Sequence, residues 1–347
     1  MDTPDLAPDA AGEVVPAEPA EEEEEDNRRK RLLLLFLLIA LGALILLSGW
    51  YLLFRKPITE LPLVVTEQPM PTYQYSLYGL TKPQGVAVTA DGSRIIVTQT
   101  GTSLDTLVLD RTGNQIGVLS PPANLVAKPH QLYPAINPVT NEVWTTDRYN
   151  GEVAIYGPDG TFLRIFDQGA DLAGWQPLGI AFDAAGDAYI SDVGGGTTVI
   201  RVFGADGKQI RTFGGSSSLD HPNGIAVAAD GTAYVTDTAN GRLQVFDASG
   251  NRIGLVERGQ AEGNLGLPVG IGFDDNGRIQ IADSSGSKVQ VYAPIVAGEP
   301  APRYINAFGE KGSGDANFSF PNGLAADGRG RVYVADWGND RLEVWSY

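Results

Sequence analysis

The chain has 347 residues, 25 basic and 42 acidic side chains, and a formal net charge of −17. Such a charge repels a phosphate backbone and argues against nucleic acid as a partner. There is no cysteine and there are two histidines, which excludes a disulfide framework, a thiolate zinc site and a three-histidine metal site. The 43 glycines and 22 prolines favour short strands and turns over long surface helices.

The N-terminal segment is strongly acidic. Its first 27 residues hold eleven acids and no base, and the basic run Arg28, Arg29, Lys30 and Arg31 follows. A segment of this composition cannot bury enough apolar surface to offset its ordering entropy. The sequence therefore predicts a disordered acidic tail over residues 1–31 that ends in a basic stop.

Residues 32–54 form a run of 23 residues without a charge. As a helix this run would be about 34 Å long, enough for a hydrocarbon core of roughly 30 Å. A buried core helix is disfavoured because the run is apolar on every face, and a cleaved signal peptide has only the weak small-residue match Ala40-Leu41-Gly42. An uncleaved transmembrane anchor at 32–54 is the preferred interpretation.

Charge on either side of the anchor predicts its orientation. Four bases precede it and two, Arg55 and Lys56, follow it, which places the N-terminus in the cytoplasm. Everything after the anchor is then extracytoplasmic, in a single-pass cell-membrane protein. Residues 55–71 contain Pro57, Pro62, Pro69 and Pro71 and are expected to form an extended linker.

The remaining 276 residues, 72–347, repeat. A Pro-x-Gly opener, or in one copy a variant of it, begins each repeat at Pro83, Pro129, Pro177, Pro222, Pro268 and Pro321. Successive openers are 46, 48, 45, 46 and 53 residues apart, so six copies fill the segment. Pro129-His130-Gln131 is the variant opener.

Each copy contains four short apolar segments separated by turns of the Asp-Gly type. In the fourth copy these segments lie at 224–227, 232–236, 242–246 and 252–256. Four such strands form one antiparallel sheet, and sheets of this repeat length stack around an axis. The prediction is an all-β fold, a six-bladed β-propeller over 72–347.

The chain ends predict how the ring closes. The sixth copy stops after its third strand, and residues 73–79 resemble a fourth strand that has no first three. We expect 73–79 to complete the last blade, since the ring would otherwise leave two strand edges unpaired.

Two stretches carry a resemblance to a known family. His221 to Phe246 reads HPNGIAVAADGTAYVTDTANGRLQVF and Phe320 to Trp345 reads FPNGLAADGRGRVYVADWGNDRLEVW. These resemble the NHL repeat, and the chain is similar to a membrane-anchored member of that family. The resemblance implies a six-bladed propeller, a fold that serves as a binding platform, as a sensor and, in related lactonases and amidating lyases, as a metal enzyme.

An acid ends the second strand of five copies, at Asp147, Asp192, Asp237, Asp283 and Asp336, while the first copy has Gln99. Five carboxylates in a ring invite a catalytic interpretation. The preferred one is structural, because an Asp at a strand end accepts hydrogen bonds from turn amides and an Arg five residues on is placed to pair with it.

The residue between Pro and Gly is expected to face the central channel. Around the ring these residues are Gln84, His130, Leu178, Asn223, Val269 and Asn322. They supply amides and one imidazole, not the carboxylates that calcium prefers or the histidines that zinc prefers, so no cofactor and no metal site is expected. Gln84, His130, Asn223 and Asn322 are candidate ligand-binding residues; alternatively they only line a water-filled channel.

A second candidate patch follows the strand-ending residues. Arg148 with Tyr149, and Trp337, lie at this position in copies two and six, which flank copy one. Trp, Tyr and Arg are the residue types that concentrate binding energy, although scattered surface aromatics are ordinary. We expect these three residues to contribute to a loop-face binding site.

The sequence favours a non-catalytic extracytoplasmic binding or scaffold propeller. Its expected partner is a protein, peptide or glycan, and no catalytic residue is assigned. The alternative is a metal-dependent lactonase- or lyase-like enzyme at the channel mouth. Absence of cysteine and the single span suit a bacterial surface protein.

Overall fold

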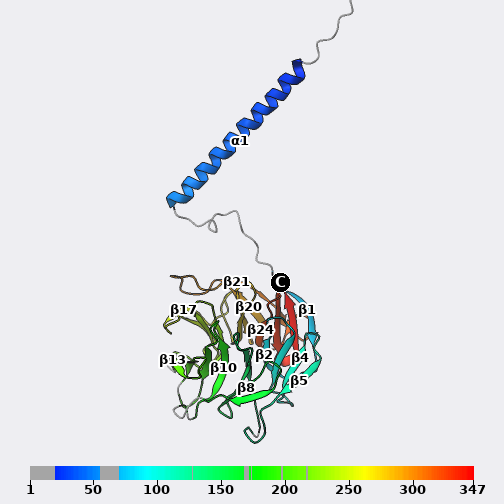
Figure 1. Cartoon of the computed structure of the whole chain (residues 1–347), viewed down its shortest axis with the longest axis vertical. Helices are drawn as coiled ribbons and strands as arrows, with labels where there is room; N and C mark the ends of the chain where they lie inside the picture. The colour runs from blue at the N-terminus through cyan, green and yellow to red at the C-terminus, as the bar shows by residue number, and fades with distance from the viewer. Residues whose placement is uncertain are drawn as a thin grey trace, which may run out of the picture. The chain divides into compact units, whose positions relative to one another are not determined.

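The computed structural model describes residues 20–54, 70–126, 128–167, 172, 174–196, 198–215 and 218–347 (Figure 1). The chain divides into two compact units, one up to Glu67 and one from Gln68 onward, and each is described by itself. Residues 1–19 of the expected tail and 55–69 of the expected linker lie outside the described residues.

The first unit contains one helix, α1 (Ala20–Phe54). Its stretch Asn27–Ser48 is long and apolar enough to cross a membrane, a test that a signal sequence near an N-terminus also passes. The expected disordered tail extended to residue 31, whereas the structure is helical from Ala20 onward. Glu and Ala are good helix formers, and acids near a helix N-terminus interact favourably with its dipole.

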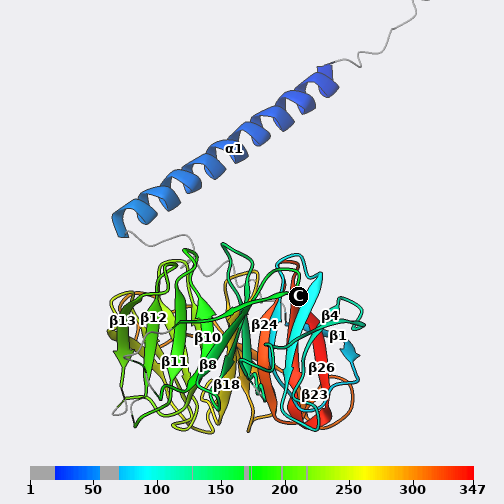
Figure 2. The same cartoon turned by 60° about the horizontal axis from the view of Figure 1, so that its bottom comes forward.

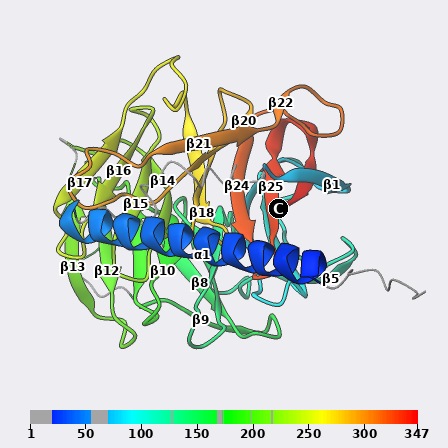
Figure 3. The same cartoon turned by 90° about the horizontal axis from the view of Figure 1, so that it is seen from above.

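The second unit contains six four-stranded antiparallel sheets, which confirms the all-β six-bladed propeller. It also contains a short parallel pair, β22 (Glu310–Lys311) and β23 (Asn317–Phe318), and a 3-10 helix, η3 (Trp337–Asn339). Each sheet runs from an innermost to an outermost strand, as β10 to β13 do in Figure 2, and the sheets surround a common centre (Figure 3). Blade 1 contains β2 (Pro83–Val88), β3 (Arg94–Gln99), β4 (Thr106–Asp110) and β5 (Gln115–Leu119). Blade 2 contains β6 (Tyr133–Ile136), β7 (Val143–Asp147), β8 (Glu152–Tyr156) and β9 (Phe162–Ile165). Blade 3 contains β10 (Pro177–Phe182), β11 (Ala188–Asp192), β12 (Val199–Phe203) and β13 (Gln209–Gly214). Blade 4 contains β14 (Pro222–Val227), β15 (Ala233–Asp237), β16 (Arg242–Phe246) and β17 (Arg252–Val256). Blade 5 contains β18 (Pro268–Phe273), β19 (Ile279–Asp283), β20 (Lys288–Tyr292) and β21 (Tyr304–Phe308). Blade 6 contains β24 (Pro321–Ala326), β25 (Arg331–Asp336), β26 (Arg341–Ser346) and, as its outermost strand, β1 (Thr72–Leu77).

Ring closure joins the two ends of this unit. β1 pairs antiparallel with β26, so that Tyr73 lies opposite Trp345 and Leu77 opposite Leu342. Leu77 is buried in an apolar cluster between blades 6 and 1, and Tyr73 packs edge-on against Trp345 at 5.9 Å. The N-terminal strand therefore completes a sheet whose other three strands end the chain.

The openers hold the innermost strands close together. A Cβ on Gly224 would lie 2.5 Å from the carbonyl oxygen of Val269 in the next blade, and four other openers have a glycine in the same kind of close contact. Only glycine allows this approach of backbone to backbone. The Gly of the motif therefore sets the packing distance around the axis.

Blade 2 departs from this arrangement. β6 begins at Tyr133 rather than at Pro129, and Tyr133 lies opposite Thr146 just as Gly224 bonds to Thr236 in blade 4. Tyr133 thus occupies the glycine position, and Leu132 rather than His130 occupies the channel position. The assignment of His130 to the channel is corrected, because the variant opener shifts the register by two residues.

Candidate functional site

The aspartates that end the second strand of five blades hold in place the segments that lead into the innermost strands. Each accepts a hydrogen bond from a backbone N–H just before the innermost strand, and Gln99 does the same in blade 1. The pairs, with the residue of the donor N–H first and the acceptor side chain second, are Thr81 and Gln99, His130 and Asp147, Gln176 and Asp192, Asp220 and Asp237, Leu267 and Asp283, and Ser319 and Asp336. These contacts support the structural interpretation of the acids.

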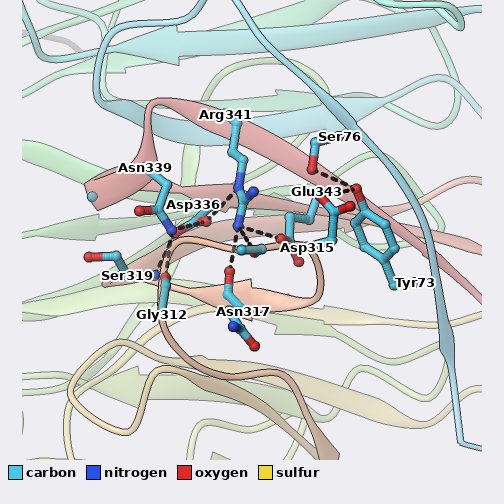
Figure 4. Close-up of polar contacts among 12 residues, drawn as sticks. Tyr73, Ser76, Gly312, Asp315, Asn317, Ser319, Asp336, Asn339, Arg341 and Glu343 are labelled. Carbon is cyan, nitrogen blue, oxygen red and sulfur yellow. Dashed lines mark hydrogen bonds and ion pairs between the residues drawn. The ribbon is translucent and has the colours of Figure 1, made fainter.

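In three blades an arginine completes the network. Arg201, Arg242 and Arg341 pair with the acids of blades 3, 4 and 6 at 2.7 to 2.9 Å. Figure 4 shows the most buried case, in which Arg341 bonds to Asp336 and to the carbonyl oxygens of Gly314 and Asn317. The guanidinium thereby ties strand β26 to the loop before β24.

Five of the seven candidate residues from the sequence meet in one depression of about 460 Å³, which we call the mouth. Blades 5, 6, 1 and 2 contribute side chains to it. The lining residues are Gln84, Thr100, His130, Leu132, Tyr149, Ser284, Phe320, Asn322 and Trp337. The volume lies within the ~300 to 1,000 Å³ typical of small-ligand sites.

The two amides of the mouth, Gln84 and Asn322, form one hydrogen-bonded group with the phenol of Tyr133, which is buried outside the lining. The Gln84 amide nitrogen donates to the Tyr133 hydroxyl at 2.7 Å and to Asn322 Oδ1 at 3.3 Å. The Tyr133 hydroxyl donates to Asn322 Oδ1 at 3.1 Å, and Asn322 Nδ2 donates to Gln84 Oε1 at 3.3 Å. Burial raises the pKa of Tyr133, so the phenol stays protonated.

The blade 2 side of the mouth is a stack of rings. The imidazole of His130 lies on the ring of Tyr149 at 4.5 Å with an interplanar angle of 18°, and the Arg148 guanidinium lies 4.9 Å from the same ring. Asp147 accepts hydrogen bonds from the backbone N–H groups of His130 and Tyr149. One buried carboxylate therefore positions both ring-bearing segments.

The blade 6 side is built around Trp337. Its indole nitrogen donates to Thr100 Oγ1 at 3.1 Å, and the Lys82 ammonium lies 4.7 Å from its ring centroid. Phe320 packs edge-on against the indole at 6.5 Å. Contacts from blade 1 thus fix the indole orientation, while Phe320 remains 53% exposed.

Backbone strain accompanies these side chains. Lys82 and Phe320, each preceding an opener proline, have φ values of 48° and 54°, and His221 before the opener of blade 4 has a φ of 46° although it does not line the mouth. A bulky residue in this left-handed region is unfavourable and persists only where the surrounding structure holds it. For Phe320 the strained backbone presents an exposed ring at the mouth.

The structure separates two candidate residues from the mouth lining. Arg148 contacts Tyr149 from outside the lining, and Asn223 lines a different, small cavity of about 50 Å³ with Tyr133 and the glycines of the openers. Thr100 and Ser284 follow strand-ending residues, as Trp337 does, but were not chosen as candidates, and neither Phe320 nor the role of Tyr133 was predicted. The absence of glycine from one opener of six was the signal available for Tyr133.

The donor set of the mouth is neutral amides, hydroxyls and one imidazole, with no Asp, Glu, Lys or Arg among its described lining residues. Within the described part of the chain, no group of three His, Cys, Asp or Glu side chains is placed to hold a metal ion. The arrangement offers ring faces and neutral hydrogen-bonding groups.

The sequence and the fold were compared with known proteins. Residues 219–246 and 318–345 match the NHL repeat, whereas no curated protein sequence matches the chain. The chain therefore carries NHL repeats on a six-bladed β-propeller.

Solved propellers are similar in fold. Virginiamycin B lyase from Staphylococcus aureus has 16% sequence identity and a TM-score of 0.54, and the match covers 80% of this chain and 100% of that one. A streptogramin B lyase structure gives 16% identity and 0.56 over 80% and 98%. A protein of unknown function from Bacteroides thetaiotaomicron gives 18% and 0.61 over 80% and 72%. At these identities the likeness shows the fold alone.

Proposed function

We propose that the chain is a binding propeller, tethered to a membrane by α1, whose mouth captures an extracytoplasmic partner without catalysis. The observation that carries this proposal is the gathering of Tyr149, Phe320 and Trp337 around the amides of Gln84 and Asn322 in one depression. Aromatic anchors at a concave site with few polar groups are the usual composition of a binding centre.

Site-directed photo-cross-linking tests this proposal in cells. A photoreactive phenylalanine analogue replaces Tyr149 or, in a second variant, Trp337, and the matched control carries it at Ile253, which is exposed on the outermost strand of blade 4. Adducts should form from the two mouth positions and not from Ile253. Equal labelling from all three positions, or none from the mouth, would contradict the proposal.

A lyase- or lactonase-like activity is the second candidate. It is favoured by the likeness in fold to two lyases and by the imidazole of His130 at the mouth. Elemental analysis of the purified chain discriminates between the two functions. One tightly held calcium or zinc ion per chain would favour the enzyme, since the binding proposal requires none.

We also propose the orientation of the anchor, with the N-terminus in the cytoplasm and the propeller outside. The four bases Arg28, Arg29, Lys30 and Arg31 before the apolar run outnumber the two after it. Protease added to intact cells should release a fragment of roughly 30 kDa. Digestion of the acidic N-terminal segment from outside would overturn this orientation.

A further inference from the structure

The chemistry of the mouth narrows the class of ligand. Its walls are flat rings, those of Tyr149 and His130 in blade 2 and of Trp337 and Phe320 in blade 6. Arg148 and Lys82 lie over two of these rings and outside the lining, so the described lining itself contains no charged Asp, Glu, Lys or Arg side chain. A ligand that fits is flat and apolar on its faces, polar at its edges and uncharged.

The amide group between the walls keeps unused hydrogen-bonding capacity. Both N–H hydrogens of Gln84 are engaged by Tyr133 and Asn322, whereas its Oε1 accepts a single bond. Among the described residues, the second N–H of Asn322 has no partner. One acceptor and one donor therefore remain side by side, and the Ser284 hydroxyl adds a group that can both donate and accept. Thr100 Oγ1 donates its hydrogen to the Lys82 carbonyl oxygen and accepts from the Trp337 indole, so it offers a ligand at most one further acceptor site.

Hydroxyl groups match this capacity because each can donate and accept one hydrogen bond. In a pyranose ring with equatorial hydroxyls, the hydroxyls project from the ring edge and both ring faces present C–H groups. Those faces stack on aromatic rings, and the edge reaches neighbouring polar groups. Phe320 adds an exposed ring at the mouth on which such a face can stack.

We propose that the mouth binds a neutral saccharide with equatorial hydroxyls, clasped between the rings of blades 2 and 6 and hydrogen-bonded to Gln84 and Asn322. This inference rests on the proposed binding function and names its ligand class. The rival occupant is a proline-rich peptide, which also docks on aromatic rings. Such a peptide needs several donors for its carbonyls, and the Trp337 indole N–H is already given to Thr100, which leaves one N–H of Asn322 and the Ser284 hydroxyl.

Saturation-transfer difference NMR on the full chain in nanodiscs tests the proposal. The probes are cellohexaose, the hexamer of N-acetylglucosamine and a polyproline decapeptide. We expect transfer to the ring protons of one or both saccharides, and a loss of affinity of about tenfold in Trp337→Ala and in Tyr149→Ala. Tyr149 is 62% exposed, so its variant tests the site even where Trp337→Ala does not fold.

The matched control is Ile253→Ala, which lies on another blade and should bind as the unmodified chain does, and melting temperatures report folding. Saccharide binding that survives both ring substitutions would overturn the proposal. Binding of polyproline alone, lost in the same variants, would replace the saccharide by a peptide. No saccharide binding with photo-cross-linking from the mouth intact would remove the saccharide and leave the binding function standing.

Discussion

Blades 2 and 4 share one four-stranded plan and differ at the opener glycine, at the residue opposite the strand-ending acid and at the two residues after that acid. In blade 4 the opener has Gly224, the strand-ending Asp237 pairs with Arg242, and the following Thr238 is buried and donates to the carbonyl oxygen of Pro268. Blade 2 has Tyr133 in place of the glycine. Glu152 lies opposite its acid, and the half-buried Arg148 and the exposed Tyr149 follow that acid.

This difference distinguishes a blade that supports the ring, blade 4, from a blade that also lines the mouth, blade 2. Both blades use a threonine hydroxyl to bond the next blade, Thr146 to Leu178 and Thr236 to Val269. Blade 4 uses the differing positions for packing, whereas blade 2 uses one of them, Tyr149, to line the mouth. The replacement of the arginine by Glu152 in blade 2 has an energetic cost. Burial, together with the charge of Asp147, raises the pKa of Glu152.

The largest expected effect concerns the fourth, outermost strand of a blade. In blade 4 this strand is β17, which follows the other three in sequence, whereas in blade 6 it is β1, from the other end of the propeller segment. Deleting residues 72–80 from the detergent-solubilised full chain should open the ring, expose two strand edges and cause aggregation. Size-exclusion chromatography and thermal unfolding measure this. Deletion of 57–65 is the control and should leave the melting temperature within about 2 °C. A cooperatively melting monomer after the first deletion would refute the closure.

Exchanging the opener residues tests the second difference. Tyr133→Gly should leave a cavity and remove the phenol to which Gln84 donates and from which Asn322 accepts, lowering the free energy of unfolding by roughly 3 to 5 kcal/mol. The reciprocal Gly224→Tyr should prevent folding, because its Cβ would meet the Val269 carbonyl at 2.5 Å. Denaturant unfolding followed by circular dichroism measures both. Two mild effects would show that the glycine position carries no packing constraint.

A third comparison sets Glu343 of blade 6 against Gln244 of blade 4. Gln244 donates to Asp237, whereas the buried Glu343 lies 2.7 Å from Arg341, accepts from the indole N–H of Trp345 and faces the charge of Asp336. Burial raises the pKa of Glu343 to about 8. The positive charge of Arg341 partly opposes this rise, and the negative charges of Asp336 and Asp315 add to it.

The sign of the resulting pH dependence follows from proton binding. The folded chain keeps a proton on Glu343 that the unfolded chain loses above its ordinary pKa of 4.5, so stability falls as pH rises from about 4.5 to 8. Glu343→Gln should therefore raise the free energy of unfolding at pH 9, by on the order of 2 kcal/mol, and much less at pH 5. Gln244→Glu should create the same dependence in blade 4. Equal gains at both pH values for Glu343→Gln would contradict this account.

The repeat explains how much of this was predictable. The blades were predictable because backbone pairing imposes a regular period on the sequence. The spacing of the openers and of the strand-ending acids shows this period, and the sixth copy, which lacks a fourth strand, shows where the ring closes. The two-residue shift that brings Tyr133 to the axis and His130 onto Tyr149 escaped prediction, because proline spacing alone does not fix register. The position of Phe320 escaped as well, since its direction depends on a positive φ.

The central claim is that a partner covers the mouth rather than the outer strands. Hydroxyl-radical footprinting in native membranes, compared with the purified chain, measures this residue by residue. The account predicts that oxidation of Tyr149, Phe320 and Trp337 is reduced in native membranes, while oxidation of Leu163 and Ile253 on outermost strands is unchanged. Unchanged oxidation at the mouth, or protection of the outer strands instead, would contradict it.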